Sequence, residues 1–133
     1  MPADVPVLDE ETRPFWEAAK ERRLLIRSCA GCGRPHYYPR PFCPFCWSEQ
    51  VSWLQASGRA TLYTYSVVHV NDLPPWNERV PYVAAVVELA EGPRMMTNLV
   101  GCDPDRLEVG MALEVDFRDD GEVAVPVFRP AEA

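Results

Sequence analysis

Lysine and histidine are scarce in this chain of 133 residues, and long hydrophobic runs are absent. Its 13 basic residues are twelve arginines and one lysine, it has two histidines, and 20 acidic residues leave a net charge of −7. This acidic balance disfavours non-specific nucleic-acid binding, which depends on neutralising phosphates. No stretch approaches the roughly 20 apolar residues that span a bilayer as a helix. Residues 1–5 are acidic and carry no apolar run, so we expect no secretory signal, no membrane attachment and a cytoplasmic protein.

Four of the five cysteines form two Cys-x-x-Cys pairs with ten residues between them: Cys29, Cys32, Cys43 and Cys46. Each pair aims two sulfurs at one point, and two facing pairs supply a tetrahedral metal site, most often for zinc. Two disulfides are the alternative, which the expected reducing compartment disfavours. Four thiolates leave no open coordination position, so we expect one structural zinc per chain and no Lewis-acid role. Iron, as in a rubredoxin-like electron carrier, is the less favoured metal.

The sequence predicts a mainly β protein in three parts. An N-terminal leader and helix occupy residues 1–23, a zinc ribbon residues 24–56, and a five-stranded OB-fold barrel residues 57–133. Ser57 and Gly58 mark the last boundary because serine and glycine favour turns. A segment as short as the ribbon rarely buries a sufficient core, so its metal would supply the missing stability.

The helix is expected over residues 9–23, with Asp9 or Thr12 as its N-cap and Pro14 tolerated in the first turn. Its apolar side would consist of Phe15, Trp16 and Ala19. Docking of this side on the chain's own core is the favoured interpretation, and contact with a partner protein is the alternative.

In the ribbon, a strand is expected at Leu24–Arg27 and a return strand or loop over residues 34–39, and Val51–Gln55 leads out of the ribbon. Gly31 and Gly33 would supply the positive φ that a knuckle turn requires.

The barrel part shows five strand patterns. Thr61–Val70 and Pro81–Leu89 are apolar on both faces, as in a strand with few solvated positions, and Arg94–Val100 follows. Residues 112–118 alternate, and residues 123–127 alternate in the last strand. The side chains expected to face the core from these two strands are Leu113, Val115, Phe117, Val123, Val125 and Val127.

Turn signals separate these strands. Residues 119–121 read Asp-Asp-Gly and predict a hairpin turn, while Pro126 would place the last strand at an edge or a bulge. Asp103 or Asp105 is a suitable cap for one helical turn between the third and fourth strands.

Several phrases of the chain, in order, carry a family resemblance. Besides the four cysteines they are Phe15–Ala19, Tyr38–Arg40, Ser57–His69, Pro81–Val83, Thr97–Cys102 and Phe128–Pro130. Together they closely resemble the zinc-ribbon/OB-fold family once called domain of unknown function 35, over roughly residues 9–130. The resemblance implies an N-terminal helix, a rubredoxin-like zinc ribbon and an OB barrel, with the four cysteines as metal ligands.

The resemblance also implies a setting for the protein. Members of that family are partner subunits or fused domains of acyl-CoA enzymes: thiolase-like proteins, thiolase-fold aldolases and MaoC-type enoyl-CoA hydratases of fatty-acid, aromatic-acid, isoprenoid and sterol side-chain pathways. We therefore expect an accessory subunit that bridges and stabilises such an enzyme, shares its CoA ester and assembles as a hetero-oligomer with two copies of this chain. The family has no universal catalytic residue, and we expect no catalysis by this chain alone.

Two groups of residues are candidates for contact with the CoA ester or the partner. Phosphates favour arginine, and adenine favours aromatic or guanidinium faces. The first group lies in the ribbon: Arg34, Tyr37, Tyr38, Arg40 and Trp47. The second lies at the long loop over residues 71–80: His69, Trp76 and Arg79. Pairing of these arginines with the chain's own acids, a structural role for His69 and a folded-back Trp76 are the alternatives.

Cys102 is expected to be a small buried filler rather than a nucleophile. A single-stranded nucleic-acid module is a second functional hypothesis, because OB folds and zinc ribbons both bind strands. An electron carrier is the third, and a stand-alone hydrolase or transferase ranks last.

Overall fold

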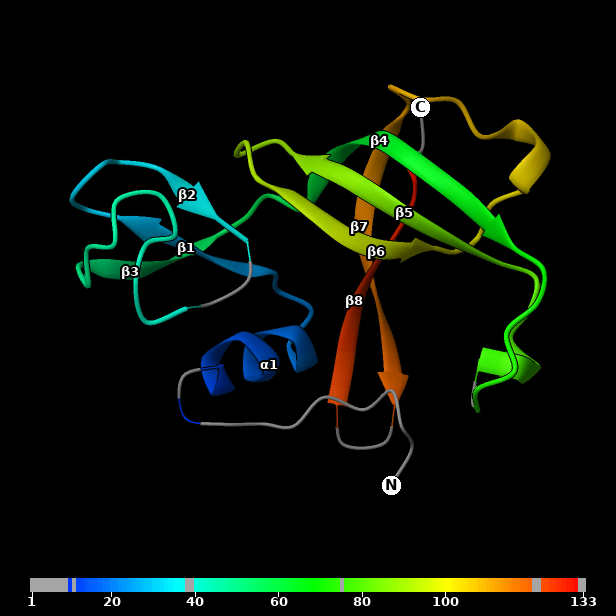
Figure 1. Ribbon diagram of the computed structural model, residues 1–133, viewed down its shortest axis with the longest axis horizontal. Coiled ribbons are helices and arrows are strands. Elements are labelled where there is room, and N and C mark those ends of the chain that lie inside the picture. Colours follow the sequence, from blue (N-terminus) through cyan, green and yellow to red (C-terminus); the bar gives the residue numbers. More distant parts are fainter. Residues whose placement is uncertain (1–9, 11, 38–39, 75, 121–122, 132–133) are drawn as a thin grey trace.

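The computed structural model describes residues 10, 12–37, 40–74, 76–120 and 123–131. Within these residues the protein is mainly β, as predicted, with one α-helix, two short 3-10 helices and two separate sheets (Figure 1). The elements of the N-terminal part are α1 (Arg13–Lys20), β1 (Leu25–Cys29), β2 (Pro35–His36) and β3 (Val51–Gln55). Those of the C-terminal part are β4 (Arg59–Val68), η1 (Trp76–Glu78), β5 (Tyr82–Leu89), β6 (Arg94–Leu99), η2 (Pro104–Arg106), β7 (Ala112–Asp120) and β8 (Val123–Pro130).

The strands of the C-terminal part close into a five-stranded barrel with the order β4-β5-β6-β8-β7. All of its pairings are antiparallel except the one between β6 and β8, in which Leu99 lies opposite Phe128. Closure leaves no free sheet edge among these strands. The predicted OB-type barrel is confirmed.

The smaller sheet is antiparallel, in the order β2-β1-β3, and it carries both cysteine pairs at one end. The described part of the chain contains no helix that is both long and apolar enough to cross a membrane.

Helix α1 joins the two sheets. It packs on β1 of the small sheet and on β8 of the barrel, between which it lies in Figure 1. Phe15 and Trp16 are 1% and 7% exposed, so the interpretation that they dock on the chain's own core is confirmed. The helix is shorter than expected because Arg22, at a φ of 64°, turns the backbone into the left-handed conformation that ends helices. Pro14 lies in the first turn as predicted, and Asp9 lies outside the described residues.

Burial along the barrel strands differs from the sequence prediction in two places. Strand β5 alternates strictly between buried and half-buried positions, and β4 is exposed at Thr61, Tyr63 and Thr64. The expectation of few solvated positions therefore holds for β5, which has no exposed residue, but is wrong for β4, whose outer face is in contact with solvent. Met96 of β6, which is 77% exposed, continues this outer face.

Strand β8 is the most buried strand of the barrel. Val123 and Val127 are buried as predicted, but Ala124 and Phe128 of the other face are fully buried too. Val115 lies opposite Phe128 and Asp116 opposite Val127, so Phe128 shares the core face of β7 and the expectation that Val123, Val125 and Val127 line that face is wrong. Strand β8 pairs with both β6 and β7, so the expected edge position is wrong. Pro126 is tolerated because the pairing with β6 is confined to a later residue, Phe128.

The turns follow local rules where the structure describes them. Asp103 caps η2 by accepting a hydrogen bond from the backbone N–H of Asp105 at 3.0 Å, which confirms the predicted cap. The expected hairpin joins β7 and β8, but its turn does not begin at Asp119, because Asp119 pairs with Ala124 and Asp120 with Val123 as part of the strands. Gly121 lies outside the described residues.

Candidate metal centre and exposed surfaces

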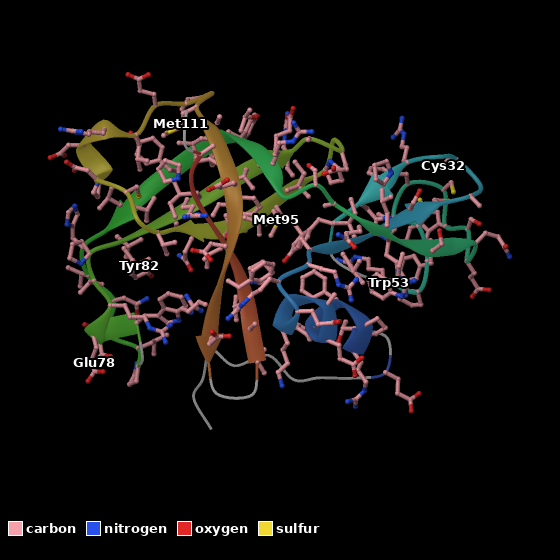
Figure 2. The ribbon with its side chains drawn as sticks, turned by 180° about the vertical axis from the view of Figure 1, so that it is seen from behind. Cys32, Trp53, Glu78, Tyr82, Met95 and Met111 are labelled. Atoms are coloured by element: carbon pink, nitrogen blue, oxygen red, sulfur yellow. The ribbon has the colours of Figure 1, made fainter. Side chains whose placement is uncertain are left out.

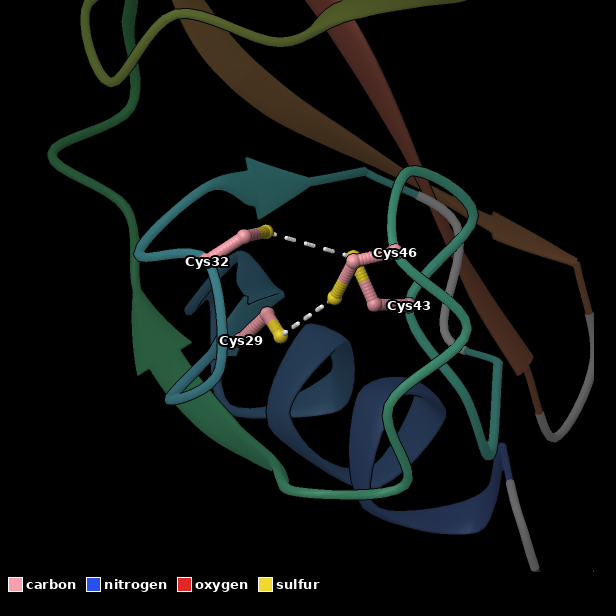
Figure 3. Close-up of side chains that lie close together, drawn as sticks. All are labelled: Cys29, Cys32, Cys43 and Cys46. Carbon is pink, nitrogen blue, oxygen red and sulfur yellow. Dashed lines mark hydrogen bonds between the residues drawn. The ribbon is translucent and has the colours of Figure 1, made fainter.

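The four predicted thiols come together at the end of the small sheet. Their Sγ atoms all lie within 4.8 Å of one another. Two pairs, one sulfur from each knuckle, are 3.6 Å apart: Cys29 with Cys46, and Cys32 with Cys43 (Figure 3). Four sulfurs around one zinc at about 2.3 Å would be spaced by about 3.8 Å, which this arrangement matches. The two sulfurs of a disulfide lie about 2.05 Å apart, so the longer distances between these Sγ atoms do not fit the disulfide alternative.

The two knuckles share one backbone design. The N–H of Gly33 donates to the carbonyl of Cys29 at 2.8 Å, and the N–H of Trp47 donates to the carbonyl of Cys43 at 2.9 Å. Gly33 and Trp47 follow their Cys-x-x-Cys pairs directly and adopt φ values of 76° and 66°. Positive φ at Gly33 is as predicted. The equivalent position of the second knuckle also has a positive φ but carries Trp47. This backbone conformation costs a tryptophan roughly 1 kcal/mol or more relative to glycine.

Gly31 serves packing rather than positive φ. A Cβ atom at Gly31 would lie 3.2 Å from both Cβ and Oγ of Ser48. The missing side chain therefore lets the first knuckle approach the residues that follow the second.

The thiols of the two knuckles differ in acidity. The backbone N–H of Cys32 is the main factor that lowers the pKa of Cys29, to about 7, against its burial. Burial raises the pKa of Cys43, but the backbone N–H groups of its knuckle bring it below its ordinary value. The backbone N–H of Ser48 lowers the pKa of Cys46. The neighbouring thiols and burial outweigh this effect and raise the pKa to about 11. Thiolates gathered this closely retain a proton that a divalent cation would displace.

These observations fit a bound metal. The donor set is four sulfurs, two of them buried (Cys29 and Cys43) and two exposed (Cys32 and Cys46), with the N–H of Phe45 3.4 Å from the Sγ of Cys43. Soft thiolate ligands in a closed tetrahedron suit zinc or iron and leave no position for substrate. The centre thus fits a structural metal.

The predicted contact residues of the ribbon lie on different sides of it. Arg34, Arg40 and Trp47 are exposed. Tyr37 is half-buried and points inward, with its ring 6.1 Å from that of Phe15. Tyr38 lies outside the described residues. The exposed ribbon residues therefore form a group without Tyr37.

Two further aromatic residues, which the sequence reasoning did not select, join the exposed group. Phe42 stacks on Trp47 with ring centroids 5.3 Å apart and an interplanar angle of 13°. Phe45 is 53% exposed, and its ring centroid lies 5.0 Å from the guanidinium carbon of Arg34. The run Pro-Phe-Cys-Trp within and after the second knuckle was the signal for this cluster, because apolar rings there have no core to enter.

The predicted residues of the long loop gather separately. Trp76 is half-buried and packs on Tyr82, with ring centroids 4.9 Å apart. Arg79 and Arg118 lie 4.9 and 5.4 Å from its ring centroid. The loop tryptophan has therefore folded back on the barrel, and Arg118 of β7 is a neighbour that the sequence did not predict. We call Trp76, Arg79, Tyr82 and Arg118 the Trp76 group.

The ribbon and the Trp76 group lie at opposite ends of the molecule. Figure 2 shows Cys32 at one end and Glu78, in η1, at the other. His69 is exposed and directly follows β4 at the start of the long loop. The sequence-predicted contact residues thus do not converge on one site.

His36 and Cys102 play structural parts. His36 lies in a row across the small sheet, opposite Arg27, whose guanidinium carbon is 3.7 Å above the ring of Trp53. His36 is 5% exposed, and neither ring nitrogen has a hydrogen-bond partner within the described residues. Burial, and then the positive charges of Arg27 and Arg40, lower the pKa of His36. Cys102 packs partly against the core, and its burial raises the pKa of its thiol.

Two family profiles match this chain and define the class of protein to which it belongs. Residues 16–52 match the family profile described as the rubredoxin-like zinc ribbon domain of ChsH2, and residues 53–118 match the profile of the ChsH2 C-terminal OB-fold domain. The chain is thus a zinc ribbon joined to an OB-fold.

A DUF35 domain-containing scaffold protein of Methanocaldococcus jannaschii is 36% identical over 126 residues, which cover 88% of this chain and 89% of that protein. The chain belongs to the DUF35 family. The zinc-ribbon/OB-fold resemblance read from the sequence is confirmed.

Two further comparisons concern proteins named for CoA chemistry or an aldolase. A probable enoyl-CoA hydratase alpha subunit of Thermomonospora curvata is 42% identical over 127 residues, which are 95% of this chain and 39% of that protein. The chain therefore spans about two fifths of that relative's length. A solved structure described as the Ltp2-ChsH2(DUF35) aldolase is 42% identical and superposes with a TM-score of 0.82, covering 95% of this chain and 98% of that one.

Proposed function

We propose that this chain is an accessory subunit of an acyl-CoA-processing complex, in which it bridges and stabilises a thiolase-fold or MaoC-type partner enzyme. The observation that carries the proposal is the likeness, over nearly the whole chain, to a domain of the Ltp2-ChsH2 aldolase and to a scaffold protein. The catalytic groups would reside on the partner. Exposed surfaces at opposite ends of the molecule suit a chain that touches more than one neighbour.

The metal of the proposal is one structural zinc ion, held by Cys29, Cys32, Cys43 and Cys46. It would fix the two knuckles to each other and thereby the exposed residues that they carry. Metal analysis of the purified protein, together with its visible spectrum, tests this assignment. One zinc per chain in a colourless protein is expected, and a red protein with thiolate-to-iron bands would replace zinc by iron.

For the CoA ester we propose the Trp76 group as the contact. Guanidinium groups bind phosphate oxygens in fork geometry, and the indole offers a face for the adenine or holds the arginines in place. Trp76→Ala should raise the KM of the assembled complex for its acyl-CoA while the subunits still co-elute. An unchanged KM would remove this loop from the CoA site.

Co-expression with the Ltp2 subunit of the similar aldolase tests the main proposal. Size-exclusion chromatography with light scattering should show one hetero-oligomer with two copies of this chain, and the partner should gain stability or activity in it. A monomeric chain that never co-elutes with Ltp2, beside an Ltp2 that is equally stable and active alone, would contradict the proposal.

A further inference from the structure

Trp47 is an unfavourable residue for its place in the fold. It adopts a φ of 66° at the position where the first knuckle has Gly33, although large side chains rarely enter this region. Its side chain gains little from folding, because it stays 72% exposed. A residue that is unfavourable in both backbone and hydration points to a role outside folding.

The surroundings of Trp47 hold it ready for contact. We define the knuckle tip as Arg34, Phe42, Phe45 and Trp47. Phe42 stacks against the indole, and Arg34 lies over Phe45, so the tip combines both knuckles. A shared metal would fix the knuckles to one another. Side chains ordered in advance lose little conformational entropy when they bind, which favours tight association.

Charge distinguishes the knuckle tip from the rest of the molecule. Residues 24–56 contain three arginines and one glutamate, whereas residues 57–133 contain six arginines and thirteen acidic residues. Arg34 and Arg40 are both exposed. Four thiolates around one divalent ion would bring the ribbon to neutrality, while the barrel segment stays acidic. An acidic partner surface would therefore be repelled by the barrel and would approach the ribbon first.

We propose that the knuckle tip docks into an apolar slot, rimmed by carboxylates, on the acyl-CoA enzyme subunit. Trp47 is the anchor that fills the slot, and Arg34 pairs with the rim. Tryptophan and arginine are the residues most enriched among those that dominate binding energy at interfaces. This inference rests on the proposed function, because it takes the partner enzyme from there.

The test is Trp47→Gly, measured as the Kd for the Ltp2 subunit by titration calorimetry. Glycine suits the backbone at this position, as Gly33 shows in the first knuckle, so the melting temperature and zinc content should be maintained. The Kd should rise at least about 30-fold, as expected for an anchor residue. Trp47→Asn, which tolerates positive φ, gives a second variant should glycine destabilise the knuckle.

Two further variants sharpen the comparison. Val109→Ala removes an exposed apolar side chain, 67% exposed, in the turn before β7, and should leave the Kd unchanged. Arg34→Glu should weaken binding at low salt, and this effect should shrink as ionic strength rises.

The outcomes separate this inference from the proposed function. Wild type that binds Ltp2 while both Trp47 variants bind within about threefold of it would overturn the docking of the tip and leave the scaffold role standing. Intact assembly with a raised KM for acyl-CoA in the Trp47 variants would overturn it too, since the tip would then face the CoA ester. Wild type that fails to bind Ltp2 contradicts the proposed function, and this inference with it.

Discussion

Gly58 lies at the junction between the ribbon and the barrel, at a position where a side chain would not fit. Its φ is 86°, and a Cβ atom there would lie 2.7 Å from a methyl carbon of Val115. Its carbonyl also accepts a hydrogen bond from the N–H of Val115 at 2.7 Å. Strand β7 therefore approaches the backbone of the chain directly at the point where β4 begins.

Replacement of Gly58 by alanine should lower the free energy of unfolding by about 2 to 4 kcal/mol, from backbone strain and overpacking together. Gly92→Ala is a matched control, because Gly92 also has positive φ (114°) but has open space where the methyl group would go. The free energy of unfolding of this control should fall by about 1 kcal/mol, from backbone strain alone. Urea unfolding of both variants measures the two changes in the free energy of unfolding. Equal decreases would show that β7 shifts to make room for the methyl group without an energetic penalty.

His36 should make the fold sensitive to mild acid. Its pKa in the folded protein is below the ordinary value of about 6.5, so the unfolded chain binds a proton more readily. Stability is therefore fully present above that ordinary pKa and is lost as the pH falls through it toward the lower folded value. The melting temperature of wild type should fall more between pH 7.5 and 5.5 than that of His36→Asn. An identical fall in both proteins would assign acid sensitivity to other groups, such as the cysteine ligands.

At the scale of elements, the small sheet depends on the knuckles. Its strand β2 has two residues, and Cys29 and Cys43, the first cysteine of each knuckle, are among its few fully buried side chains. Cys43→Ser places a poorer ligand at a position that is 0% exposed and should abolish metal binding. Hydrogen exchange should then show loss of protection over residues 24–56 and loss of partner binding. Cys102→Ser, outside the four-cysteine cluster, is the control that should keep its metal, and a Cys43→Ser protein with full metal and protection would contradict this account.

Elements set by local pattern were predictable, and those set by tertiary packing were not. Strand β1, at Leu25–Cys29, overlaps the strand predicted at Leu24–Arg27, and the cap at Asp103 follows from one side chain and one nearby N–H. The burial of both faces of β8 was missed, because β8 also packs against α1, which is distant in sequence. The positive φ of Trp47 was missed because the residue type argues against it.

On the scale of the whole molecule, Phe15 belongs to a buried cluster that contains residues of both the ribbon and the barrel, such as Ile26 and Leu62. Its ring lies 4.8 Å from that of Trp16 and 6.1 Å from that of Tyr37, and it is 1% exposed. Phe15→Ala should cost about 3 to 5 kcal/mol, because the cavity forms between ribbon and barrel. Lys20→Ala, on the exposed side of the same helix, should be nearly neutral. Wild type should unfold in one thermal transition, and a separate early transition of the ribbon would show that α1 does not couple the sheets.

The predicted contact residues could be selected from the sequence, but their arrangement could not. Residue types alone made Trp47 and Trp76 candidates, in two separate groups, and did not tell how far apart the groups lie. Helix α1 fixes the orientation of the ribbon against the barrel, and this orientation separates them to opposite ends. Spacing along a chain carries no information about such an angle.

The packing of α1 on β8 has a consequence for synthesis on the ribosome. The helix ends at Lys20 and β8 begins at Val123, so about 100 residues must be made before its docking surface exists. The two knuckles lie within 18 residues of each other, Cys29 to Cys46, and can capture their metal long before that. The emerging chain would therefore carry a finished metal centre beside an undocked aromatic helix. Until β8 emerges, Phe15 and Trp16 remain available to chaperones.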